Sequence, residues 1–93
     1  MVQNIKNIQI IIAGRVQGVG FRYSAVHKAQ QIGIKGFVRN MYDGSVFIEA
    51  EAEETRVDYF LLWCHKGPSF ARVEKVKTTE GTVKNYSSFT VKS

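Results

Sequence analysis

Residues 14–22 read GRVQGVGFR and stand between an alternating apolar run and a segment with helical periodicity. Gly18 and Gly20 allow the tight turns with positive φ that a strand-to-helix connection needs. Consecutive backbone N–H groups in such a loop, next to a helix N-terminus, form a concave site for an anion. Arg22 adds a planar, permanently charged guanidinium at the end of the loop. The stretch therefore predicts a β-to-α joint that cradles a phosphate-like group.

The segments around this joint alternate between the periods of strands and helices. In chain order they predict a strand over 8–13, a helix over 21–32, strands over 34–41 and 46–50, a helix over 57–64, a strand over 71–79 and a short closing strand within 87–92. This order is the ferredoxin-like β-α-β-β-α-β arrangement. Right-handed crossovers then place both helices on one face of the sheet. We expect an α+β sandwich with a four- to five-stranded antiparallel sheet, its closing strand at an edge.

Three local signals add detail to this prediction. Asp43-Gly44 predicts a hairpin with a type I′ turn, which requires positive φ at both central residues. Val73 and Val76 are three residues apart, so we expect a bulge in the strand that carries them. Gly67-Pro68 is expected to end the second helix.

The 93-residue chain has the size of one domain, and we expect a single domain over residues 1–93. It holds no apolar run of the roughly 18 residues that a membrane-spanning helix needs. Residues 1–7 are polar and lack the apolar region of a signal peptide. The lone cysteine, Cys64, excludes an internal disulfide and a cysteine-based metal site. These features predict a cytoplasmic protein. Its net charge of +5 suits an anionic ligand but equally suits ordinary solubility.

Two common phosphate-binding motifs are absent. No stretch has the glycine and lysine spacing of a P-loop, and a dinucleotide fingerprint starting at Gly18 would need glycine where Tyr23 stands. Binding of nucleoside triphosphates and dinucleotides is therefore disfavoured. The predicted cradle is sized for a single small anion.

Asn40 is the candidate partner of Arg22, because it closes the run GFVRN at residues 36–40 just before the predicted turn. Its amide can hold a water but cannot act as a general base, while Arg22 can bind phosphate oxygens and stabilise developing charge. The sequence alone leaves open whether the two side chains meet. Because the loop contains no strong acid, the leaving group must need no proton. A carboxylate, whose acid has a pKa of about 4, meets that need, and acyl phosphates have such a leaving group.

At these residues the chain resembles the acylphosphatase family. Residues 12–22 are similar to the family's first signature, and residues 36–40, with Gly44 and Val46 at the expected spacing, are similar to its second. Residues 67–76 and 86–91 resemble the entry to the family's fourth strand and its C-terminal strand. The similarity extends over nearly the whole chain and departs at Ala52, where the second signature usually ends in glycine.

The resemblance implies a metal-free hydrolase that converts an acyl phosphate to a carboxylate and inorganic phosphate, with no cofactor and no covalent enzyme intermediate. It implies that Arg22 binds the phosphoryl group and that Asn40 orients the attacking water. Inorganic phosphate is then product and inhibitor. The size and charge of the chain favour a monomer, and we expect no nucleic-acid or membrane partner. The cradle is expected to consist of the backbone N–H groups of Gln17, Gly18, Val19, Gly20, Phe21 and Arg22.

The same residues allow other interpretations. Gly18 and Gly20 could simply form a tight turn, and Asn40 could simply start the hairpin. An RNA-binding module is a second possible function, because residues 35–38 echo an aromatic RNA-recognition motif; however, that motif belongs on the third strand, which offers only Phe47. A non-catalytic anion sensor, or a domain that serves a larger assembly, is a third.

Overall fold

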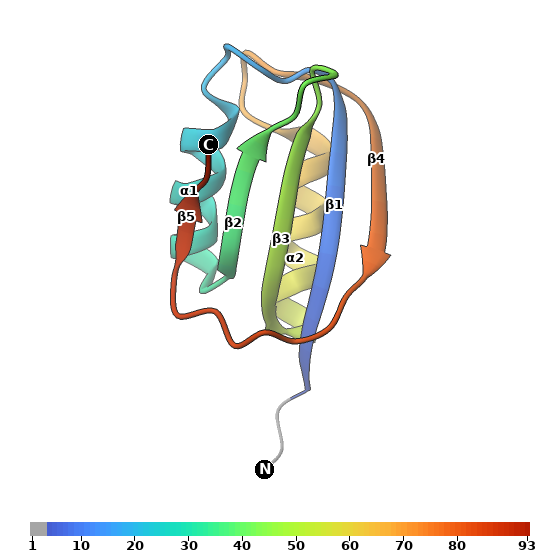
Figure 1. Cartoon of the computed structure of the whole chain (residues 1–93). Coiled ribbons are helices and arrows are strands. Elements are labelled where there is room, and N and C mark those ends of the chain that lie inside the picture. The colour runs from blue at the N-terminus through green and yellow to red at the C-terminus, as the bar shows by residue number, and fades with distance from the viewer. Residues whose placement is uncertain (1–3) are drawn as a thin grey trace.

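Apolar side chains alternate along the central strands, and this alternation gives the sheet one buried face. The computed structural model describes residues 4–93, so residues 1–3 of the predicted polar segment 1–7 lie outside the described residues. The elements, shown in Figure 1, are β1 (Ile5–Arg15), α1 (Phe21–Ile32), β2 (Lys35–Asn40), β3 (Val46–Glu53), α2 (Glu54–Lys66), β4 (Arg72–Glu80) and β5 (Phe89–Val91).

The strands form one sheet in the order β4-β1-β3-β2-β5, and both helices cover the same face of it (Figure 1). Strand β3 lies between β1 and β2 and pairs antiparallel with each of them. Strands that follow one another along the chain, β1 and β2, therefore do not pair. The predicted ferredoxin-like α+β architecture is confirmed.

Strand β5 makes the sheet mixed rather than purely antiparallel, which the sequence did not predict. It pairs parallel with β2, with Gly36 opposite Phe89 and Val38 opposite Val91. The cause is topological. Strand β4 ends at the end of the sheet where β2 begins, and the connection to β5 stays at that end (Figure 1). The chain must then enter β5 in the direction of β2. The other strand pairs are antiparallel, as predicted, and β5 lies at the predicted edge.

The core lies between the sheet and the two helices. Isoleucines of β1 and β3, such as Ile10 and Ile48, are fully buried on the sheet side. The predicted helical stripes meet them: Phe21, Ala25 and Ala29 of α1 and Val57, Phe60 and Cys64 of α2 are buried. Burying each large apolar side chain contributes about 1.5–3 kcal/mol. This packing fixes the N-terminus of α1 against the ends of the central strands.

All three predicted local features can be compared with the structure. Helix α2 ends at Lys66 with Gly67 as its C-cap, so the predicted end of the second helix is confirmed. The type I′ turn is wrong: among the described non-glycine residues only Asn85 has a positive φ, so Asp43 does not fit that turn. Instead the loop spans residues 41–45, Gly44 alone has φ 93°, and the Asp43 carboxylate accepts hydrogen bonds from the backbone N–H and hydroxyl of Ser45 at 2.9 and 2.6 Å. The predicted β4 bulge is confirmed, because Ala13 faces Lys75 while the next residue faces Val73.

The helices of the described part of the chain are too short or too polar to cross a membrane.

Candidate active site

The topology brings the ends of β1 and β2 together. Because both strands are antiparallel to β3, they run in the same direction and finish at the same end of the sheet. Ile12 of β1 and Asn40 of β2 both pair with Val46 of β3. The loop that follows β1 and the side chain that closes β2 therefore meet, which the sequence alone left open.

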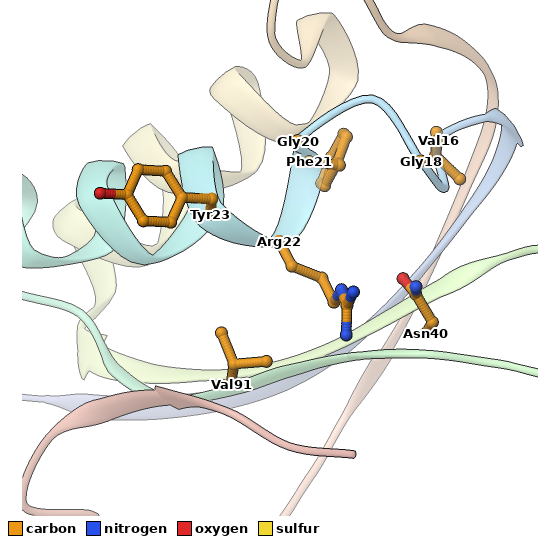
Figure 2. A pocket seen from close by; sticks show the side chains of 8 residues that line it. All are labelled: Val16, Gly18, Gly20, Phe21, Arg22, Tyr23, Asn40 and Val91. Atoms are coloured by element: carbon orange, nitrogen blue, oxygen red, sulfur yellow. The ribbon is translucent and has the colours of Figure 1, made fainter.

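A hollow of about 280 Å³ lies where they meet. Arg22 and Asn40 both project into it, with the glycine loop along one side (Figure 2). The residues that line it come from the loop, α1, β2 and β5: Val16, Gly18, Gly20, Phe21, Arg22, Tyr23, Asn40 and Val91. The candidate pair predicted from sequence thus shares one pocket.

The glycines set the conformation of the loop. Gly18 has φ 73° and Gly20 has φ 78°, values in the left-handed region that side chains with a Cβ rarely adopt. A Cβ at either position would meet no atom within 4 Å, so the requirement is for backbone conformation rather than for space. The loop is thereby turned so that it leads directly into α1.

The N-terminus of α1 faces this pocket without a partner from its own chain. Gly20 is its N-cap, no side chain caps it, and the first turn carries no acidic residue. The first N–H groups of a helix have no intrahelical acceptor, and the helix dipole makes this end positive. An anion in the pocket supplies the missing acceptor and charge.

Gln17 holds the loop in place through its side-chain amide. Its side-chain Nε2 donates hydrogen bonds to the backbone oxygens of Met41 at 2.7 Å and Ser45 at 2.8 Å. These two carbonyls belong to the hairpin loop that follows Asn40. The clamp fixes the distance between the cradle and the asparagine.

The two polar side chains of the pocket, Arg22 and Asn40, can still form ionic or hydrogen-bonding contacts with a ligand. Arg22 is exposed, and the ion pair found among residues 4–93 joins Lys84 to Glu49 elsewhere on the molecule. Asn40 is half-buried, and its Oδ1 is buried without a hydrogen-bond partner in the protein. A buried oxygen in that state costs about 1–3 kcal/mol unless something hydrogen-bonds to it. A water held by Asn40 would satisfy this oxygen.

Three lining residues, Val16, Tyr23 and Val91, were not predicted from the sequence. Val16 precedes the predicted cradle directly and is buried. Val91 arrives from β5 through its pairing with Val38, a contact that no local pattern indicates. Tyr23 could have been suspected from its place next to Arg22. In contrast, two predicted cradle residues do not line the pocket: the Gln17 side chain binds the hairpin loop, and the Val19 side chain packs against the core. Nowhere in residues 4–93 do three His, Cys, Asp or Glu side chains gather closely enough to hold a metal ion.

The chain is similar to known proteins in both sequence and structure. The sequence model of the acylphosphatase family matches residues 8–91. A curated acylphosphatase of Acaryochloris marina is 43% identical over 98% of this chain and 98% of its own. The solved acylphosphatase of Coxiella burnetii has a TM-score of 0.92 and 35% identity, covering 96% of this chain and 94% of its own. Full-length HypF matches over 100% of this chain but only 12% of its own, with a TM-score of 0.89 and 32% identity.

Proposed function

The chain belongs to the acylphosphatase family and hydrolyses acyl phosphates, and we propose that Arg22 and Asn40 carry this reaction without a metal or a covalent intermediate. The observation that supports the assignment most directly is their convergence on one pocket at the N-terminus of α1. The loop N–H groups and the Arg22 guanidinium bind the phosphoryl oxygens. Asn40 holds the attacking water.

The reaction is then a direct displacement at phosphorus. The water oxygen, oriented by Oδ1 of Asn40, forms a bond to phosphorus while the bond from phosphorus to the acyl oxygen breaks. The electron pair of the broken bond leaves on the carboxylate, and both water protons end on the product, dihydrogen phosphate. Because a carboxylate is stable without a proton, no general acid is needed. Charge on the phosphoryl oxygens is stabilised by Arg22 and by the positive end of α1.

Turnover of benzoyl phosphate by the purified protein, with a metal chelator present, tests this proposal. We expect hydrolysis in the parent and a loss of roughly 10²–10³-fold or more in Arg22→Ala, because charge stabilisation at the transferring group is lost. Arg72→Ala removes an exposed arginine outside the pocket and serves as the matched control. Full activity in Arg22→Ala, or activity abolished by the chelator, would contradict the proposal.

The structure also bears on the other functions that the sequence left open. An RNA-binding face needs accessible aromatic rings. Phe37, in the segment that echoes the RNA motif, is only 8% exposed and is covered by the Lys92 ammonium 4.3 Å from its ring centroid. A non-catalytic anion sensor would be protected by inorganic phosphate against heat but would not turn over benzoyl phosphate, so the same experiment distinguishes it.

The proposal includes a cytoplasmic monomer with residues 1–93 acting as one domain. Cys64 is a buried free thiol, as is usual in a reducing compartment. Inorganic phosphate, which fits the same cradle as the substrate, is expected to inhibit as a product.

A further inference from the structure

The face of the sheet that the helices leave uncovered carries a row of side chains across four strands (Figure 1). Residues paired across neighbouring strands point to the same face of a sheet. Ile11 of β1 pairs with Lys77 of β4 and with Phe47 of β3, and Phe47 pairs in turn with Arg39 of β2. The adjacent Ile10 is fully buried in the core, so this row faces away from the helices. The cross-strand row therefore reads Lys77, Ile11, Phe47, Arg39.

The middle of the cross-strand row is apolar and its two ends are positively charged. Ile11 is 40% exposed, and Phe47 is half-buried beside it. Lys77 is exposed at one end. At the other end the Arg39 guanidinium lies over the Phe47 ring, with its central carbon 5.6 Å from the ring centroid. The row thus combines apolar surface that a partner can reach with a cation on each side of it.

Carboxylates of the chain do not neutralise these cations. Glu49 and Glu51 share the same face but are only 4% and 3% exposed, and the β4–β5 connection binds both of them. Among residues 4–93 the ion pair joins Lys84 to Glu49, and the exposed Glu74 of β4 leaves Lys77 without one. The cations of the row are therefore available to carboxylates of another molecule.

The arrangement of the row distinguishes between kinds of acidic partner. Single-stranded nucleic acid needs accessible rings for stacking, but Phe47 lies beneath the Arg39 guanidinium. Phe37, on the same face, lies beneath the Lys92 ammonium, 4.3 Å from its ring centroid. An anionic membrane would meet the long cationic side chains and make no use of Ile11 between them. Protein interfaces combine an apolar centre with a polar rim, so the row favours an acidic segment of a protein.

We propose that the cross-strand row is a docking surface for an extended segment of another protein, in which an apolar side chain lies between two carboxylates. Strands about 4.8 Å apart place the backbones at Lys77 and Arg39 about 14 Å from each other. An extended chain that crosses the strands spans about 13 Å from residue i to residue i+4, and residues i, i+2 and i+4 face the same side. Carboxylates at i and i+4 then meet the two cations, and the apolar side chain at i+2 rests on Ile11 and Phe47.

Titration of the isotope-labelled protein with a synthetic peptide tests this surface. The probe carries the pattern Glu-Ser-Leu-Ser-Glu, and NMR shifts of the backbone amides report where it binds. We expect the amides of Ile11, Phe47 and Lys77 to shift, while those of Gly20 and Arg22 in the pocket stay in place. Peptides with glutamine for glutamate, or with serine for leucine, should each bind roughly fivefold more weakly or worse.

Variants of the protein separate the charged end of the row from its apolar centre. Lys77→Glu should weaken peptide binding roughly five- to tenfold, because attraction becomes repulsion. Ile11→Thr keeps a β-branched side chain but loses apolar contact, and should weaken binding roughly threefold. Lys66→Glu makes the same change of charge on α2, which covers the other face, and is the matched control. Benzoyl phosphate turnover should match the parent in all three variants, because none of these residues lines the pocket.

Three results would overturn the docking surface. The first is equal weakening in Lys66→Glu and Lys77→Glu, which would mean attraction by net charge alone. The second is unchanged binding in Ile11→Thr. The third is a parent that binds poly-uridylate or phosphatidylserine vesicles but not the peptide, which would assign the face to nucleic acid or membrane. Binding is measured apart from turnover, so a parent that binds the peptide but hydrolyses no benzoyl phosphate would contradict the proposed function and leave the docking surface intact.

Discussion

The side-chain Nε2 of Gln17 lies 2.7 Å from the backbone oxygen of Met41, so the loop between β1 and α1 is tied to the residue that follows Asn40. The same nitrogen donates to the Ser45 oxygen at 2.8 Å. One amide group thus spans two segments more than 20 residues apart in sequence. The geometry of the pocket depends on this link, because the β1–α1 loop and Asn40, at the end of β2, come from different segments of the chain.

Gln17→Ala removes this link, and we expect kcat for benzoyl phosphate to fall about tenfold or more while affinity for inorganic phosphate changes less. Small misplacements of positioned groups have large effects on rate. The backbone oxygens of Met41 and Ser45 lose a donor, so the free energy of unfolding should fall by about 1–2 kcal/mol. Steady-state kinetics, phosphate titration and urea denaturation measure the three quantities. A variant with unchanged kcat would show that the clamp does not position the site.

Local patterns predicted most of the architecture because they report which face of each segment is buried. The apolar stripes of α1 and α2, the alternation in β1 and β3, and the Val73–Val76 spacing were each confirmed. The predicted turn type was wrong because an Asp-Gly pair is compatible with several kinds of hairpin loop. The hydrogen bonds from Ser45 to the Asp43 carboxylate favour one of these loops, and the two residues 43 and 44 alone do not indicate which.

Two features could not be predicted because they depend on how distant segments cross. Val91 reaches the pocket only through the parallel pairing of β5, which the β4–β5 connection determines. Glu49 and Glu51 alternate along β3 as solvent-facing residues would, yet they are 4% and 3% exposed. The backbone N–H groups of Lys84 and Tyr86 bind Glu51, so the β4–β5 connection covers this part of the sheet.

Arg22→Lys keeps the positive charge but loses the planar arrangement of N–H donors. We expect kcat to fall roughly 10²-fold or more, since a point charge cannot replace a guanidinium that binds two oxygens at once. Arg22 is exposed, so the melting temperature should stay close to that of the parent. Kinetics with benzoyl phosphate and a thermal melt, with Arg72→Lys as the control, check both statements. Parent-like kcat would mean that charge alone suffices.

Asn40→Ala separates binding from chemistry. The variant loses the amide that we propose orients the water, and we expect kcat to fall roughly 10²-fold. Phosphate affinity should remain nearly unchanged, because the loop and Arg22 are intact. In Asn40→Asp the added carboxylate repels the phosphoryl group, so phosphate affinity should fall as well. Kinetics and calorimetric phosphate titration distinguish these outcomes. Equal losses of kcat and affinity in Asn40→Ala would mean that Asn40 binds phosphate instead.

The buried carboxylates on the other face of the sheet predict how stability depends on pH. The side-chain Nδ2 of Asn7 donates hydrogen bonds to Glu49 at 3.0 Å and to Glu51 at 2.9 Å, and the Lys84 ammonium lies 2.6 Å from Glu49. Burial opposes ionisation of Glu51, but hydrogen bonds from Asn7 and from the backbone of Lys84 and Tyr86 outweigh it. The pKa of Glu51 therefore lies below its ordinary value of 4.5, and that of Glu49 is lowered in the same direction.

A carboxyl whose pKa is lowered by folding stabilises the fold above the unfolded-state pKa, and this contribution is lost as the pH falls through the folded-state pKa. We therefore expect the free energy of unfolding to decrease as the pH falls below about 4.5. In Glu51→Gln the new NH₂ group faces N–H donors, so stability at pH near 7 should fall by about 1–3 kcal/mol. The additional decrease in the free energy of unfolding below pH 4.5 should be smaller in this variant than in the parent. Urea denaturation across this range measures both, with the exposed Glu74→Gln as control. Parallel pH profiles for the parent and Glu51→Gln would show that Glu51 does not contribute.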